Sequence, residues 1–194
     1  MSVIAVGVAN PSVSELQSPD LSAITSIQAN DFVLFGQPDG FALDRVALDA
    51  TWKQLQRQAH PDHFATQGAA AQRVAMQWSV RINEAYSRLK DPLKRAAYWC
   101  ELQGVPVNAE NNTAMPPAFL MQQMEWREAL DDARDEQALE ALLDATDAAR
   151  RELHAALAQA IDQDRNARDA VSHVRALMFV ERFAEEVHQR LDRF

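Results

Sequence analysis

The chain has 194 residues, a formal net charge of −9 and 47% apolar residues, a composition typical of a globular protein with a real core. Its single cysteine, Cys100, excludes an internal disulfide and any zinc site built from several cysteines, and it favours a reducing compartment. No apolar run approaches the ~20 residues that a membrane-spanning helix needs. With only five glycines and abundant Ala, Leu, Gln, Arg and Glu, the composition predicts an all-α fold.

Residues 1–30 contain no lysine or arginine and are rich in Ser, Ala, Val and Pro. A secretory signal peptide has a basic first segment and a mitochondrial presequence has arginines, so neither fits. We interpret this stretch as a disordered extension. Its apolar residues Leu16, Leu21, Ile24 and Ile27 have only marginal helical spacing.

Residues 31–103 form the first predicted unit, which two amphipathic helices dominate. Apolar residues recur at helical spacing on both sides of a short stretch around His60, at Leu48, Trp52, Leu55 and Ala59 and at Val74, Trp78, Ile82, Ala85 and Leu89. Asp44 is the predicted N-cap of the first helix, over about 44–59. Pro61 ends that helix because proline lacks an N–H and biases the residue before it away from the helical region. We therefore predict an antiparallel hairpin with His60, Pro61 and Asp62 at its tip.

A third helix is predicted at the end of this unit. Asp91 and Pro92 have the pattern of an N-cap and a first helical residue, and the helix over about 92–103 ends at Gly104. Residues 104–117 contain three prolines and three asparagines, and we interpret them as a linker.

Residues 118–194 contain neither proline nor glycine, so long helices can run there unbroken. We expect three, over about 118–132, 135–161 and 165–192, packed as an antiparallel bundle. This part carries ten Arg against seventeen Asp or Glu, a balance that argues against nucleic-acid binding.

By itself the hairpin tip has an ordinary structural explanation, with Asp62 as a turn residue and His60 as the end of a helix. His60 and His63 are potential metal ligands, but Pro61 removes the helical geometry that would align them and no third His or Cys lies nearby in the sequence. A His/Asp pair also occurs in hydrolases, yet no nucleophile, glycine-rich phosphate loop or paired carboxylates accompany it. We therefore predict no metal, no cofactor and no catalytic residue.

In this order and spacing, the residues around the tip resemble the J-domain, the co-chaperone module that stimulates the ATPase of Hsp70-type chaperones. The similar segments are Phe32 to Gly36, Leu55 to Asp62, Ile82 to Pro92 and Arg95 to Tyr98. The residues that the resemblance assigns to chaperone binding are His60, Pro61, Asp62, Arg57, Lys53 and Arg45. The three basic residues would face an acidic surface of the chaperone's nucleotide-binding domain. His63 stands where J-domains usually have lysine, so we expect weak, transient binding.

A J-domain followed by a short linker and an acidic three-helix bundle is similar to the HscB family, the J-domain co-chaperones of iron–sulfur cluster biogenesis. The similarity covers residues 31–194, with a second signature over 119–130. In that family this helix binds the cluster scaffold protein IscU, and the ATPase is of the HscA class. The positions that the resemblance assigns to scaffold binding are Leu120, Met121, Met124, Glu125, Glu128, Asp132 and Phe179.

The residues of the helix over 118–132 favour a binding face without naming its partner. Leu120 and Met124 fall on one side of the helix, methionine is common on adaptable binding surfaces, and a row of carboxylates beside them would orient a basic partner. The alternative is that Leu120 and Met124 fill the bundle core while the acids form a solvated face.

Together with the composition, the resemblance implies a cytoplasmic, monomeric co-chaperone that stimulates an HscA-class ATPase and presents IscU to it, and we expect no nucleic-acid or membrane partner. We expect Trp99 or Val105 to pack the two units into a fixed L-shape. Residues 1–30 lack the cysteine pairs of the zinc module that eukaryotic relatives carry, which favours a bacterial type. The alternative function is a general J-domain co-chaperone that binds unfolded clients through its methionines. A small helical enzyme would need a pocket with perturbed acids, for which the sequence offers no candidate.

Overall fold

The computed structural model describes residues 29–108 and 115–193, and every regular element within them is helical, so the prediction of an all-α fold is confirmed. The elements are α1 (Asp31–Leu34), α2 (Arg45–Gln58), the 3-10 helix η1 (Pro61–Gln67), α3 (Ala69–Lys90), α4 (Pro92–Leu102), α5 (Pro117–Asp132), α6 (Glu136–Ala158), the π-helical turn η2 (Gln159–Gln163) and α7 (Ala167–Leu191). The extension predicted at the N-terminus lies outside the described residues, except for Ala29 and Asn30.

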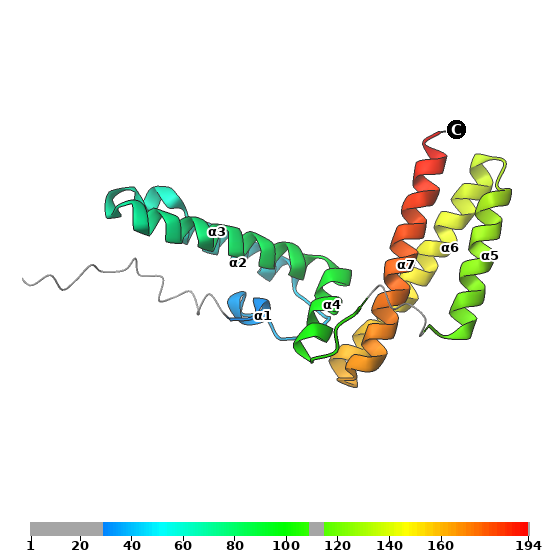
Figure 1. Cartoon of the computed structure of the whole chain (residues 1–194), viewed down its shortest axis with the longest axis horizontal. Coiled ribbons are helices and arrows are strands. Elements are labelled where there is room, and N and C mark those ends of the chain that lie inside the picture. Colours follow the sequence, from blue (N-terminus) through cyan, green and yellow to red (C-terminus); the bar gives the residue numbers. More distant parts are fainter. Residues whose placement is uncertain (1–28, 109–114, 194) are drawn as a thin grey trace, which may run out of the picture.

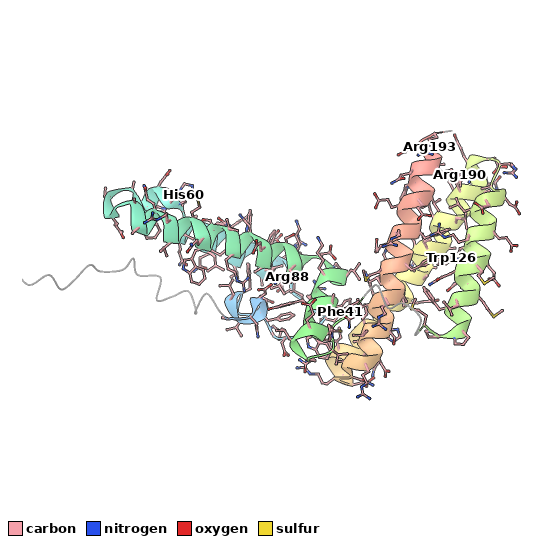
Figure 2. All side chains as sticks on the ribbon, in the orientation of Figure 1. Phe41, His60, Arg88, Trp126, Arg190 and Arg193 are labelled. Carbon is pink, nitrogen blue, oxygen red and sulfur yellow. The ribbon has the colours of Figure 1, made fainter. Side chains whose placement is uncertain are left out.

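Two arms meet at a corner (Figure 1). The hairpin of α2 and α3 forms one arm, and α5, α6 and α7 form the other, with α4 at the corner against α7. Figure 2 shows His60 near the far end of the hairpin and Phe41 near the corner. The predicted hairpin and three-helix bundle are therefore both present.

Capping residues explain where α2 begins and where α4 begins and ends. The carboxylate of Asp44 accepts hydrogen bonds from two backbone N–H groups of the first turn of α2. Asp91 caps α4 by accepting one, from the backbone N–H of Lys94, with Pro92 in the first turn of the helix. Gly104 follows the C-cap of α4, Gln103, and its φ of +75° is the left-handed conformation expected of the residue after a C-cap.

The inward stripe of α3 differs from the predicted one at its first member. Trp78, Ile82 and two further predicted residues are buried, but Val74 is 40% exposed and Ala75 lies inside instead. From Ala75 onward the buried positions alternate steps of three and four residues, which keeps one stripe facing α2, and Val74 falls outside that stripe. The prediction for Val74 was wrong because a spacing of four also fits residues 74 and 78.

A continuous apolar core joins the two arms. Trp99 on α4 is 1% exposed, and it belongs to the same cluster as Leu157, Ile161 and Val174 from the bundle, with Val105 packed against it. The prediction that Trp99 or Val105 packs the units together is therefore confirmed. Because protein cores are close-packed, a shared core of this kind holds the arms in one arrangement.

Polar contacts also fix the corner, and they come from the turn between α6 and α7. The carboxylate of Asp162 accepts hydrogen bonds from the backbone N–H groups of Phe41 (2.6 Å) and Ala42 (2.9 Å). Arg165 donates to the carbonyl and the carboxylate of Asp39 at 2.8 and 2.6 Å. Gly40 permits this approach, because a Cβ there would lie 2.6 Å from Oδ1 of Asp162.

The far end of the bundle has a second core. Its buried members come from α5, α6, α7 and the residue after α5, and they are Trp126, Leu130, Ala133, Leu139, Leu142, Ala149, Val180, Phe183 and Val187. The predicted helices 118–132, 135–161 and 165–192 match α5, α6 and α7 to within a few residues, with η2 replacing the last residues of the second.

Candidate functional site

The hairpin tip presents a carboxylate to solvent. His60 caps η1, where its Nδ1 accepts a hydrogen bond from the backbone N–H of Asp62 at 3.3 Å, and Pro61 occupies the first turn. The side chain of Asp62 is 91% exposed, and its Oδ2 lies 3.6 Å from His60 Nδ1. The tip therefore places an acceptor-only group on a short, capped turn, an arrangement suited to a donor on a partner.

Contacts behind the tip hold it in place. Phe64 of η1 is buried, and the Ser79 hydroxyl on α3 donates to the carbonyl of Ala59 at 3.0 Å. Gln56 on α2 donates to the Ser79 carbonyl and to Asn83. These bonds tie both helices to the turn, so the backbone of the tip is fixed while the side chain of Asp62 stays free to meet a partner.

The structure divides the three predicted basic residues of α2. Lys53 and Arg57 are exposed, but Arg45 forms an ion pair with Asp49 at 2.7 Å, donates to the Tyr86 hydroxyl at 3.2 Å and lies over the Tyr86 ring. Arg45 also lies 12 residues, roughly 18 Å, from Arg57 along the helix. Only Lys53 and Arg57 belong to the half of α2 near the tip.

Charge and hydrogen bonding tune this internal network. The hydrogen bond from the Tyr86 hydroxyl holds the pKa of Asp49 below its ordinary value, and the bond to Asp49 raises the pKa of Arg45 and of Tyr86. The network therefore engages the guanidinium of Arg45, whose side chain is exposed, in contacts with Asp49 and Tyr86.

The outer surface of α5 forms the second candidate site. Leu120, Met121 and Met124 are 40%, 63% and 72% exposed, so the alternative that Leu120 and Met124 fill the core is wrong. Trp126 and Leu130 from the opposite side of α5 fill the core instead. The exposed carboxylates beside the apolar residues are those of Glu125, Glu128 and Asp132. We refer to these six exposed residues together with Phe179 as the α5 face.

Phe179 reaches the α5 face from α7. It is partly buried, and its ring packs edge-on against Phe119 and stacks with Trp126 and Phe183 at centroid distances of 5.9 to 6.3 Å. The structure therefore brings Phe179 together with α5 across more than 50 residues of sequence. The tip lies at the end of the other arm (Figure 2).

Sequence reasoning missed several residues that shape these sites. Arg127 pairs with Glu186 across α5 and α7, and Asp162 and Arg165 hold the corner. None of these contacts is local in the sequence. The spacing along α5 indicates only that Arg127 lies on the same side of the helix as Leu120 and Met124.

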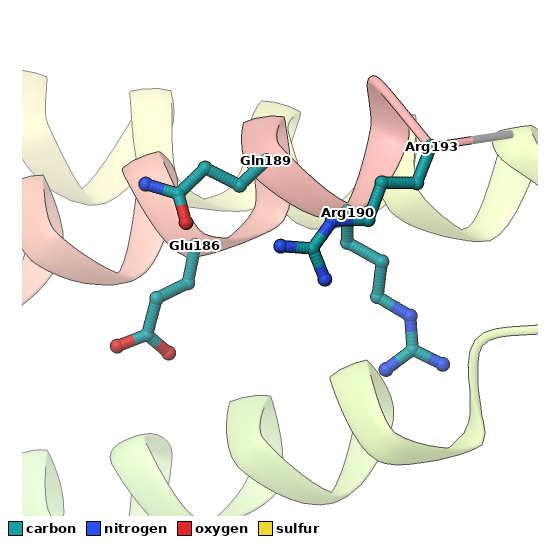
Figure 3. Close-up of a pocket in the computed structure, with 4 residues that line it drawn as sticks. All are labelled: Glu186, Gln189, Arg190 and Arg193. Atoms are coloured by element: carbon teal, nitrogen blue, oxygen red, sulfur yellow. The ribbon is translucent and has the colours of Figure 1, made fainter.

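The described surface has further features outside the tip and the α5 face. A hollow at the end of α7 is lined by Glu186, Gln189, Arg190 and Arg193 (Figure 3). Arg190 there donates to the carbonyl of Ala133, which closes the end of α5 against α7. Across residues 29–108 and 115–193, no three His, Cys, Asp or Glu side chains are grouped to hold a metal ion. None of the helices described here is both long and apolar enough to cross a membrane.

Comparisons with known proteins agree on one family. Residues 115–188 match the family described as the HSCB C-terminal oligomerisation domain. The chain is 52% identical to the co-chaperone protein HscB homolog of Cupriavidus taiwanensis over 165 residues, which cover 84% of this chain and 93% of that protein. It is 49% identical to the Burkholderia multivorans homolog over 173 residues, covering 88% and 98%.

Solved structures give the same result. The chaperone HscB from Vibrio cholerae superposes with a TM-score of 0.73 at 37% identity, covering 85% of this chain and 99% of that one. Human co-chaperone protein HscB superposes with a TM-score of 0.82 over 95% and 94% of the chains, and at 22% identity that likeness concerns the fold alone. With relatives at about half identity over most of both chains, this chain belongs to the HscB family of J-domain co-chaperones.

Proposed function

We propose that this co-chaperone stimulates the ATPase of an Hsp70-type chaperone of the HscA class through the hairpin tip, and that it delivers the iron–sulfur scaffold protein IscU held on the α5 face. The observation that carries the proposal is the placement of two exposed, chemically different surfaces on two arms that share one core. One surface is polar with a protruding carboxylate, and the other is apolar with an acidic border. Each surface therefore suits a different partner.

The chemistry of the tip supports chaperone binding. Asp62 would pair with a basic group on the chaperone, with His60 and Pro61 fixing the turn that carries it. Lys53 and Arg57 would meet an acidic surface, and such contacts raise the association rate and weaken with salt. Arg45 would contribute less, because its guanidinium is already bound to Asp49 and Tyr86.

The co-chaperone would accelerate ATP hydrolysis without a catalytic residue of its own. A ligand that binds the hydrolysis-competent state more tightly shifts the chaperone toward that state, and the gain cannot exceed the difference in binding free energy. Holding the scaffold on the same molecule raises its local concentration at the chaperone, which couples the two events.

The cytoplasm is the proposed site of action. Cys100 is fully buried, and burial raises the pKa of its thiol to about 11, so the thiol stays protonated and unreactive. Cys100 is the single cysteine of the sequence and lies in the core as a free thiol. The protein therefore has no disulfide that an oxidising compartment would have to form.

A second candidate function is a general J-domain co-chaperone for unfolded clients. The exposed Met121 and Met124 favour it, because methionine side chains adapt to varied apolar partners. The row formed by Glu125, Glu128 and Asp132 favours the scaffold instead, since a fixed line of carboxylates selects a partner of matching charge.

Steady-state ATPase rates of an HscA-class chaperone test the proposal, measured with the co-chaperone, IscU, both or neither. The variants are Asp62→Asn and the triple substitution Leu120→Ala/Met124→Ala/Phe179→Ala, with Glu84→Gln as a control carboxylate on α3. We expect synergy between wild type and IscU, no stimulation by Asp62→Asn, and loss of the synergy alone in the triple variant. Full stimulation by Asp62→Asn would refute chaperone binding through the tip. Synergy with unfolded peptides in place of IscU would establish the second candidate.

A further inference from the structure

The partly buried phenylalanine of the α5 face, Phe179, belongs to an aromatic stack. Trp126 and Phe183 are buried and lie 5.5 Å apart, and Phe179 stacks on both of them. Phe119 closes the other side of Phe179 in an edge-to-face contact. These aromatic contacts limit the positions that the Phe179 ring can adopt.

Arg127 on α5 also contacts this ring. Its guanidinium lies 5.7 Å from the centre of the Phe179 ring and 5.4 Å from that of Phe183, within the range of a cation–π contact. Both of its Nη atoms donate to the carboxylate of Glu186, Nη1 to Oε2 and Nη2 to Oε1. Figure 3 shows the Glu186 side chain extending from α7 toward α5. A two-bond fork of this kind fixes the plane of the guanidinium as well as its position.

The ion pair between Arg127 and Glu186 is expected to add little to the stability of the fold. The side chains of Arg127 and Glu186 are 46% and 37% exposed, and exposed ion pairs contribute little to the free energy of folding. The fork does restrict a long, flexible side chain beside the apolar residues of the α5 face. On α5, Leu120, Met124 and Arg127 succeed one another at steps of four and three residues, so Arg127 ends the apolar line on that side.

We propose that the Arg127–Glu186 pair positions Phe179 for the partner of the α5 face. This inference rests on the proposed function, in which that face binds the scaffold. The guanidinium lies over the ring and keeps it in the stack, so the partner meets Phe179 already ordered beside Phe119 and Trp126. An ordered contact residue loses less conformational freedom on binding, which raises affinity without a new contact.

The pair is a positioning device, so removing either half should weaken binding without unfolding the bundle. Glu186→Gln keeps the shape of the side chain and removes the charge that holds the fork. Arg127→Lys keeps the positive charge and removes the planar group that lies on the ring. For each variant we expect scaffold affinity to fall by about three- to tenfold, the range that ordering one side chain provides.

The experiment measures IscU affinity by calorimetric titration and the thermal unfolding midpoint of each full-length variant. Glu185→Gln, an exposed carboxylate on the same helix, is the matched control and should bind like wild type. The inference predicts reduced affinity for Glu186→Gln and Arg127→Lys with thermal unfolding midpoints within about 2 °C of wild type. Proton spectra of the Phe179 ring should also lose the shifts caused by Trp126 and Phe183, a change that an affinity effect through charge alone would not produce.

Three outcomes would overturn the inference. Wild-type affinity in Glu186→Gln would show that the pair has no role. Loss of affinity in Glu186→Gln but not in Arg127→Lys would show that a positive charge, and not the stacked plane, is what matters. A parallel fall in the thermal midpoint would assign the pair to stability. If the triple variant Leu120→Ala/Met124→Ala/Phe179→Ala binds IscU like wild type, the proposed function itself fails, which separates the two results.

Discussion

The hairpin tip and the α5 face are both exposed, but they are built in opposite ways. The tip consists of consecutive residues whose geometry comes from a proline and a capped turn, with His60 and Asp62 two positions apart. The α5 face depends on α7, whose Phe179 and Glu186 reach it across more than 50 residues. A local site tolerates changes elsewhere in the fold, whereas a site assembled from two helices depends on their packing.

Breaking the α5 face should give the largest change in binding. The triple variant Leu120→Ala/Met124→Ala/Phe179→Ala removes the apolar side chains of the face, and we expect scaffold affinity to fall by about 100-fold or more, since central apolar anchors dominate interface energies. Calorimetric titration with IscU measures this loss of affinity. Val46→Ala/Met76→Ala/Val80→Ala, which removes three exposed apolar side chains from the hairpin, serves as the control and should bind normally. Equal losses in both variants would contradict the assignment.

The corner links the two surfaces, so damage there should lower stability and coupling together. In Gly40→Ala the new Cβ would displace the Asp162 carboxylate, and in Asp162→Ala two backbone N–H groups would lose their acceptor. We expect each to lower the free energy of unfolding by about 1–3 kcal/mol. Urea unfolding measures the loss, with Asp164→Ala on the same turn as the control. An unchanged stability in both variants would show that these contacts do not hold the arms.

Substitutions of two arginines on α2 should have smaller effects, and they should differ in how far they slow association with the chaperone. Arg57→Ala removes an exposed charge near the tip, and we expect a roughly two- to tenfold slower association with the chaperone and a weaker dependence on salt. Arg45→Ala removes a guanidinium bound to Asp49 and Tyr86, so it should lower the thermal midpoint and leave the association rate nearly unchanged. Stopped-flow measurements at two salt concentrations distinguish them. A larger rate effect for Arg45→Ala would reverse our assignment.

The smallest expected effect is a pH dependence at the corner. Burial holds the pKa of His154, which packs edge-on against Phe41, below its ordinary value of 6.5, with Glu181 opposing the shift. Because the unfolded chain then binds more protons than the folded one, the stabilisation is complete above pH 6.5 and is lost as the pH falls through 6.5 toward the lower folded value. Burial also lowers the pKa of His173, so this residue contributes to stability with the same dependence on pH.

Urea midpoints at pH 7.5 and pH 5.5 measure this dependence. Wild type should lose stability at the lower pH, and His154→Phe should lose less because its ring cannot take up a proton. Identical losses in the two proteins would assign the pH dependence to other groups.

The parts of this fold that the sequence predicts well are those set by neighbouring residues. Asp44 and Asp91 are N-caps, Gly104 follows a helix, and the tip turns at Pro61, because each of these features depends on the few residues around it. The helix lengths follow in the same way from periodicity and from the absence of proline.

The parts that were missed depend on contacts between distant residues. The bond from Phe41 to Asp162 spans 121 residues, and nothing in the sequence near either residue indicates the other. The contact of Arg45 with the Tyr86 hydroxyl was missed because the spacing of Arg45 on α2 gives no sign of Tyr86 on α3, and its role on a basic binding face stays a prediction. The exposure of Leu120 and Met124 was left open for the same reason, since periodicity cannot show which side of α5 another helix covers.

The central claim is that one molecule must carry both surfaces, and a mixing experiment tests it most directly. Asp62→Asn keeps the α5 face and the triple α5 variant keeps the tip, so an equimolar mixture contains both surfaces on separate chains. We predict that the mixture with IscU stimulates the chaperone no more than the triple variant alone, because separate chains provide no local concentration of scaffold. Restoration of the wild-type synergy by the mixture would contradict the claim.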